Sequence, residues 1–124
     1  MITKPIMCGG QFTAEIFNDN DYYLDEGDVV VIRNLVAIAA EDIPLQRRGV
    51  VYTCGAFVVP KAENCEVNVG DELYWCSLSL EVTTAKEYQY SGATYPGIYL
   101  GIASDYAHAD DEDVRLLLNY PKNR

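Results

Sequence analysis

Two Gly-Asp pairs, each followed directly by an apolar run, constrain the fold of this chain more than any other feature. Gly27-Asp28 precedes Val29–Ile32, and Gly70-Asp71 precedes Glu72–Cys76. Glycine adopts the left-handed backbone that a tight turn needs, and aspartate hydrogen-bonds to nearby backbone groups. The β-branched and aromatic residues that follow favour strands. The pattern therefore predicts two turns, each leading into a strand, with turn-stabilising roles for Gly27, Asp28, Gly70 and Asp71.

Further short runs predict a chain made almost wholly of strands. Candidate strands cover residues 11–17, 35–39, 50–59, 80–84, 98–103 and 114–118, and Arg33-Asn34 is a candidate hairpin turn. Residues 61–66 are the best place for a helical turn. Short strands at this spacing, separated by turns, are typical of a small sandwich or barrel. We predict an all-β, single-domain β-sandwich or barrel with at most one short helical turn. Its expected parts are an N-terminal segment (1–26), a β domain (27–119) and a polar tail (120–124).

The longest candidate strand, residues 50–59, is apolar at both odd and even positions. Side chains alternate between the two faces of a strand, so this pattern predicts a strand that is covered on both sides. One cover would be the core of the domain and the other a neighbouring subunit. Phe57 and Val59 are therefore candidate interface residues. Gly55 within the strand predicts a bend or a close backbone approach.

Charge and hydropathy exclude several classes of partner. The chain has 124 residues, of which 19 are acidic and nine are Lys or Arg, giving a formal charge of −10. A nucleic-acid surface needs clustered Lys and Arg, so we expect no nucleic-acid partner. The apolar runs are too short to span a bilayer, so we expect no membrane partner. The first residues lack the apolar segment of a secretory signal, so we expect a protein that is made in the cytoplasm and not exported.

No group of residues forms a recognisable catalytic or metal-binding motif. The one histidine, His108, lies in an acidic segment, residues 106–113, that is typical of an exposed turn. Residues 19–28 superficially resemble an EF-hand loop, but Tyr23 and Leu24 occupy the positions where that loop needs a ligand and a glycine. The four cysteines form no C-x-x-C pair and are expected to act as small apolar residues: Cys8, Cys54, Cys65 and Cys76. We predict a protein that is not an enzyme, with no catalytic, cofactor-binding or metal-binding residues.

Tyrosine is abundant, with ten in the chain, and four are close together in sequence: Tyr88, Tyr90, Tyr95 and Tyr99. A tyrosine ring buries a large area while its hydroxyl remains hydrogen-bonded, which suits protein interfaces and carbohydrate contacts. These tyrosines either pack onto their own sheet or form a contact surface. We treat them as candidate interface residues.

The serial order of these segments resembles the DUF2190 capsid cement (decoration) proteins of tailed phages. The matching segments lie between residues 27 and 119 and include Gly27-Asp28-Val29-Val30, Gly49-Val50-Val51-Tyr52, Val69-Gly70-Asp71-Glu72-Leu73-Tyr74-Trp75 and Val114-Arg115-Leu116-Leu117-Leu118-Asn119. The resemblance implies a small all-β protein that binds the outer surface of an assembled capsid and stabilises it. It also implies the major capsid protein as partner, self-association with a trimer favoured, and a place on the virion exterior.

Two other functions remain open from the sequence. A head-fibre or tail-associated adhesin domain could bind a host glycan through the tyrosine-rich segment. A small hydrolase could use the acidic clusters, either as paired carboxylates or with a metal.

Overall fold

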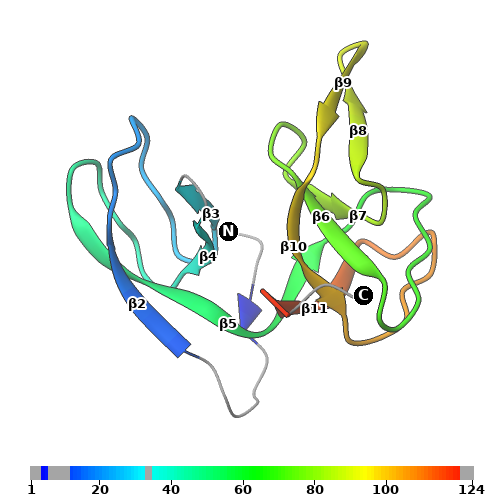
Figure 1. The fold of residues 1–124 in the computed structure, drawn as a ribbon, viewed down its shortest axis with the longest axis horizontal. Coiled ribbons are helices and arrows are strands. Elements are labelled where there is room, and N and C mark those ends of the chain that lie inside the picture. Colours follow the sequence, from blue (N-terminus) through cyan, green and yellow to red (C-terminus); the bar gives the residue numbers. More distant parts are fainter. Residues whose placement is uncertain (1–3, 6–11, 33–34, 121–124) are drawn as a thin grey trace.

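A computed structural model describes residues 4–5, 12–32 and 35–120, and shows an all-β protein (Figure 1). The described residues contain no helix, and residues 61–66 form a turn. The strands are β1 (Lys4–Pro5), β2 (Phe12–Phe17), β3 (Val29–Ile32), β4 (Leu35–Ala39), β5 (Arg48–Pro60), β6 (Glu72–Cys76), β7 (Glu81–Thr83), β8 (Glu87–Tyr90), β9 (Ala93–Pro96), β10 (Ile98–Ala103) and β11 (Asp113–Leu118). The prediction of a small all-β domain is confirmed.

Nine strands form one curled sheet, and β8 and β9 form a separate two-stranded sheet. The long strand β5 runs through both halves of the molecule (Figure 1). Its first half pairs with β2 and β4, and its second half pairs with β11 and β1. Gly55, with φ of 129°, lies where β5 passes from one half to the other. We call residues 12–54 lobe 1 and residues 55–120 lobe 2.

The two lobes repeat one arrangement of four antiparallel strands. Lobe 1 has the order β3-β4-β5-β2, and lobe 2 has the order β6-β10-β11-β5. An isolated bridge closes the same end of each lobe, Leu24 with Ile43 in lobe 1 and Val67 with Ala107 in lobe 2. The chain therefore builds the same supersecondary unit twice and shares β5 between the copies.

The two Gly-Asp turns occupy equivalent places in this repeat. The Gly27 N–H donates to Ala39 O and the Gly70 N–H donates to Ala103 O, both at 2.8 Å. In return, Ala39 N–H donates to Asp28 O and Ala103 N–H donates to Asp71 O, both at 2.9 Å. Each turn thus joins the start of one strand to the end of the strand beside it.

Each lobe encloses a core of apolar side chains from equivalent positions. The lobe 1 core contains Ile16, Leu24, Val30, Ala39, Ile43 and Val51. The lobe 2 core contains the corresponding Val59, Val67, Leu73, Ala103, Ala107 and Leu116. Burying a side chain of the size of Val, Leu or Ile contributes roughly 1.5–3 kcal/mol, so these positions supply most of the driving force for folding. Val29, Val31 and Val36 of lobe 1 pack against the lobe 2 cluster and join the lobes.

The two buried polar residues of the described chain also occupy equivalent places. Asn18 follows β2 and its N–H donates to Arg47 O, whereas Lys61 follows β5 and its N–H donates to Glu112 O. The Asn18 side chain donates to Tyr22 O, Ile43 O and Pro44 O, and the Lys61 ammonium donates to Ala62 O and Ala109 O. Each side chain therefore supplies donors to the backbone carbonyls that close its lobe, since a buried carbonyl without a partner is costly.

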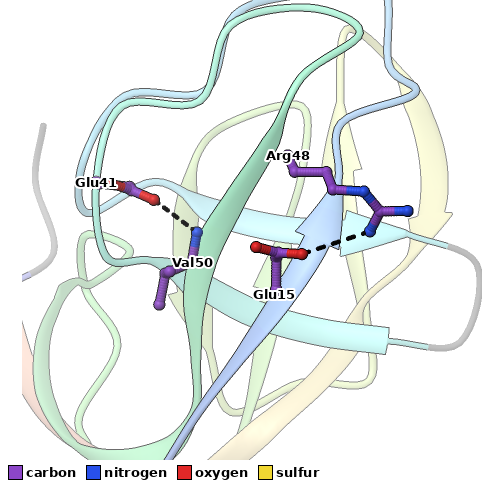
Figure 2. A network of polar contacts seen from close by, with 4 residues as sticks. All are labelled: Glu15, Glu41, Arg48 and Val50. Carbon is purple, nitrogen blue, oxygen red and sulfur yellow. Dashed lines mark hydrogen bonds and ion pairs between the residues drawn. The ribbon is translucent and has the colours of Figure 1, made fainter.

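Exposed polar contacts line the β2–β5 pair in lobe 1 (Figure 2). The Glu41 carboxylate accepts a hydrogen bond from the Val50 N–H at 2.9 Å. Arg48 on β5 lies 3.6 Å from Glu15 on β2, and both side chains are more than 60% exposed. An ion pair this exposed contributes little stability, so β2 is held mainly by its backbone ladder and by Ile16.

Most expected strands are present, with a few differences. β5 begins at Arg48, earlier than predicted, because its first residues pair with β2. β7 is shorter than predicted, because Leu80 lies in a turn with φ of 59°. The β8–β9 hairpin was not predicted.

The predicted Arg33-Asn34 turn lies outside the described residues, although Ile32 and Leu35 on either side of it are paired. The division at residue 27 stays a prediction, and β2 on its N-terminal side belongs to the lobe 1 sheet.

Candidate functional site

The predicted turn residues hold their turns through the aspartate side chains. Asp28 Oδ2 accepts a hydrogen bond from the Asp25 N–H, and Asp71 Oδ2 accepts one from the Asn68 N–H, both at 2.8 Å. Gly27 and Gly70 have φ of 90° and 88°. These carboxylates are therefore engaged with the backbone of their own turns.

A third turn of this kind was missed by the sequence analysis. Asp111 Oδ2 accepts a hydrogen bond from the His108 N–H at 2.8 Å, in the same pattern as the two Gly-Asp turns. The residue before Asp111 is an aspartate instead of a glycine, so the Gly-Asp signal is absent there. The spacing of three residues between donor and carboxylate was the signal that could have found it.

Acidic side chains surround the closed end of both lobes. In lobe 1, Asp42 accepts a hydrogen bond from the Glu26 N–H at 2.8 Å, beside the Leu24–Ile43 bridge. In lobe 2, a shallow cavity of about 260 Å³ is lined by Glu63, Asn64 and the segment 109–112. The described residues contain no group of three or more His, Cys, Asp or Glu side chains that could hold a metal ion. These ends therefore present negative charge.

His108 lies in the exposed turn where the sequence predicted it. Its ring packs edge-on against Tyr106, with ring centroids 4.7 Å apart. Tyr106 donates a hydrogen bond to Glu66, and this bond raises the pKa of the Tyr106 hydroxyl. These three side chains form a polar surface contact that ties the segment after Lys61 to the acidic turn.

The four candidate interface tyrosines lie in two separate places. Tyr88, Tyr90 and Tyr95 belong to the β8–β9 hairpin, where the rings of Tyr88 and Tyr95 lie 5.9 Å apart. Tyr99 lies on β10, packs against Tyr74 at 5.7 Å and donates a hydrogen bond to Tyr120 O at 2.6 Å. The β8–β9 hairpin, which carries Tyr88, Tyr90 and Tyr95, projects from the body of the protein (Figure 1).

Phe57 and Val59, the other two candidate interface residues, are fully buried within a single chain. Both belong to the lobe 2 core. They lie on the face of β5 that the domain itself covers, so they have no exposed surface to offer a neighbouring subunit. Of the four cysteines, Cys76 is buried, Cys54 and Cys65 are half-buried, and Cys8 lies outside the described residues.

A groove between the lobes has no counterpart in the sequence analysis. Its volume is about 350 Å³, and its apolar lining comes from both lobes: Tyr22, Leu24, Val29, Val31, Trp75 and Leu80. Asp28 and Ser77 add its polar groups. Residues far apart in sequence form this groove only after the two lobes pack together. No local pattern could have indicated it.

Comparison with protein families favours one of the functional classes left open by the sequence. A family model described as "Phage cement protein" matches residues 8–118. This chain belongs to the phage cement protein family. The match includes both lobes and the β8–β9 hairpin. The comparisons with curated proteins and with solved structures gave no match.

Family membership makes this cement protein a structural component of a phage virion that associates with the capsid. The resemblance seen in the sequence is confirmed at that level. Among the described residues, no helix is long and apolar enough to cross a membrane.

Proposed function

We propose that this cement protein binds the outer surface of an assembled capsid and stabilises the shell by bridging neighbouring capsid subunits. No chemical step is involved, because stabilisation comes from the surface that binding buries across joints in the shell. A specific contact needs on the order of 1,000 Å² of buried surface in total. The observation that carries the proposal is the family match, which extends over the whole described fold apart from its two ends.

The charge distribution supports the acidic closed ends of the lobes as the surface that meets the capsid. The chain carries a formal charge of −10, and Asp25, Glu26 and Asp42 in lobe 1 are exposed at such an end. In lobe 2 the exposed acidic segment is residues 110–113. Complementary charge speeds association and selects partners, so the matching capsid surface should be basic.

The test adds purified protein to assembled, expanded capsids of the same phage that lack it. A closed shell admits no added protein, so binding to it reports contact with the outside. We expect the protein to sediment with the capsids and to raise their melting temperature in calorimetry. If it neither sediments with them nor changes that temperature, the proposal is wrong.

A charge-neutralised variant locates the contact. Asp110→Asn with Glu112→Gln removes two exposed charges at the lobe 2 end without touching Asp111, which holds the turn. Glu15→Gln on β2, an exposed position away from the acidic ends and from the β8–β9 hairpin, is the matched control. We expect the double variant to bind capsids more weakly and with a smaller salt dependence, and the control to bind as the wild type does. Equal binding by all three would remove the acidic end from the contact.

We also propose that the protein acts as a trimer, since closed symmetric assemblies allow one chain to repeat its contacts on a symmetric shell. Sedimentation velocity of the protein alone tests this part. A trimer is expected, and a monomer at all concentrations would exclude it.

A further inference from the structure

The two lobes differ most in the length of one connection, which joins β3 to β4 in lobe 1 and the equivalent strands β6 to β10 in lobe 2. In lobe 1, Ile32 pairs with Leu35, and only residues 33–34 lie between them. In lobe 2, Trp75 pairs with Ile98, and residues 76–97 lie between them. This longer connection contains β7 and the β8–β9 hairpin. Lobe 1 closes its core without such a segment, so the common scaffold does not need it.

Only part of this connection serves the core of lobe 2. Val82 on β7 is fully buried and packs in that core. The β8–β9 hairpin instead projects away from the lobe (Figure 1), and among the described residues its strands pair only with each other. Its base is tied by the Gly97 N–H, which donates to Lys86 O at 2.8 Å, and by the Leu78 N–H, which donates to the Tyr88 hydroxyl. A two-stranded hairpin alone is marginally stable in water, so a contact with another surface would stabilise it.

The hairpin is the nearly neutral part of an acidic protein. Lys86 and Glu87 are the only charged residues in the segment 86–97, whereas the whole chain carries a charge of −10. Two copies of the chain repel each other through most of their surface, and least through this segment. Its tyrosine, serine and glycine composition is typical of surfaces that bind proteins, and Tyr90 is 41% exposed. Charge therefore favours the hairpin as a contact between copies rather than with a basic partner.

The inter-lobe groove offers the matching surface. Its rim includes Tyr22 and Leu80, which are 53% and 57% exposed in the single chain. Leu80 also adopts φ of 59°, a left-handed conformation that is unfavourable for leucine. An exposed leucine side chain on a strained backbone adds little to the stability of a single chain. Covering it with a second copy would give its side chain a favourable environment.

We propose that the β8–β9 hairpin of one copy docks into the inter-lobe groove of a second copy. Donor and acceptor surfaces are different, so the contact is head-to-tail and closes into a ring when the rotation between copies permits. The role of this contact on a capsid rests on the proposed cement function. Whether the contact forms is independent of that function, because association is measured on the protein without capsids.

Two variants and one control test the contact by sedimentation velocity over a range of concentrations. The first variant replaces residues 87–96 with Asn-Gly, a two-residue turn that joins Lys86 to Gly97, whose backbone groups already pair. The second is Leu80→Asn, which removes the apolar rim and suits the left-handed backbone. The control is Leu45→Asn, at another leucine that is exposed, by 43%, and lies outside the groove.

We expect the wild type and Leu45→Asn to sediment as an oligomer of the 13.8 kDa chain. The truncated variant and Leu80→Asn should be monomeric, or should associate about tenfold or more weakly than the wild type, as expected when a residue that carries much of the binding energy is lost. At a concentration low enough for the wild type to be monomeric, the melting temperature of Leu80→Asn should be unchanged or higher, since its backbone strain is relieved. A lower melting temperature with unchanged association would assign Leu80 a purely structural role and refute the proposal.

Mixing the two defective variants separates this geometry from a hairpin-to-hairpin contact. The truncated variant still has a groove, and Leu80→Asn still has a hairpin, so an equimolar mixture should form a heterodimer. A mixture that stays monomeric, or a wild type that is monomeric at all concentrations, refutes the proposal. Loss of capsid binding by an intact oligomer would instead refute the cement function and leave this contact standing.

Discussion

Replacing Asn18 with alanine should destabilise lobe 1 strongly, because this buried side chain makes four hydrogen bonds to the backbone, one of them buried and three part-buried. Asn18 is fully buried, and its Nδ2 donates to Tyr22 O, Ile43 O and Pro44 O at 3.1, 3.0 and 3.3 Å. Its Oδ1 accepts a hydrogen bond from the Asn20 N–H at 3.1 Å. Alanine removes all of these contacts and leaves carbonyls without a donor.

The expected loss follows from the number of hydrogen bonds lost. Ile43 O keeps the hydrogen bond from the Leu24 N–H, so Tyr22 O and Pro44 O are affected most. A lost hydrogen bond costs about 0.5–1.5 kcal/mol net, and the Asn18 side chain makes four, so we expect Asn18→Ala to lower the free energy of unfolding by about 2–4 kcal/mol. For a chain of this length, that corresponds to a fall in melting temperature of roughly 6–18 °C. Asn18→Asp should lose at least as much, because it places a second acceptor against the same carbonyls.

Urea unfolding, followed by circular dichroism and by fluorescence of Trp75, measures these free energies. Trp75 is the only tryptophan and lies in lobe 2, so agreement between the two signals would show that the lobes unfold together. Asn68→Ala is the matched control, because Asn68 is an exposed turn residue, and it should change the free energy by less than about 0.5 kcal/mol. A loss below about 1 kcal/mol for Asn18→Ala, or one equal to that of Asn68→Ala, would refute the reasoning.

Three further predictions concern the turns, the lobe 2 sheet and pH. Gly70→Ala should lower the free energy of unfolding by about 1–2 kcal/mol through its left-handed backbone alone, since a Cβ there meets no atom within 4 Å. Asp71→Ala should lower it by about 1 kcal/mol, because the hydrogen bond from the Asn68 N–H is lost. Urea unfolding measures both values, and no loss in either variant would contradict the turn-stabilising role. Gly101→Ala should cost more than about 4 kcal/mol, because its Cβ would lie 1.9 Å from Leu117 O, and soluble expression with an unchanged melting temperature would contradict this. The hydrogen bond to Glu72, together with burial, raises the pKa of Tyr74 to about 12, so its contribution to stability is complete below about pH 10 and is lost as pH rises toward 12. Melting temperatures between pH 9 and 12 should therefore fall less steeply for Tyr74→Phe than for the wild type, and parallel curves would show that Tyr74 does not contribute.

The strands and the two Gly-Asp turns could be predicted from sequence because their causes are local. β-branched runs favour pleated backbone, and glycine marks positions with positive φ. The β8–β9 hairpin escaped prediction because its strands are short and its turn, Ser91-Gly92, lies between tyrosines that also suit a loop. The third turn escaped because Asp110 stands where the other turns have glycine.

The candidate interface was harder to predict, because exposure depends on contacts between distant residues. Phe57 and Val59 have the same apolar character as surface residues that bind a partner, but lobe 2 folds over them. Tyr99 is close in sequence to the hairpin tyrosines, yet its strand carries it to Tyr74 and away from them. Sequence proximity therefore grouped four tyrosines that the fold divides between two places.

The sequence by itself determined the all-β class, the position of most strands, the acidic character and the family resemblance. These properties depend on residue types and on the spacing of residues close together in sequence, and both can be read without knowledge of the fold. Only the tertiary structure showed that the two Gly-Asp turns are equivalent parts of a repeated lobe, because the repeat is kept in hydrogen bonds and core positions more than in residue identity. The inter-lobe groove likewise required the structure, since Tyr22 and Leu80 become neighbours only when the two lobes pack against each other.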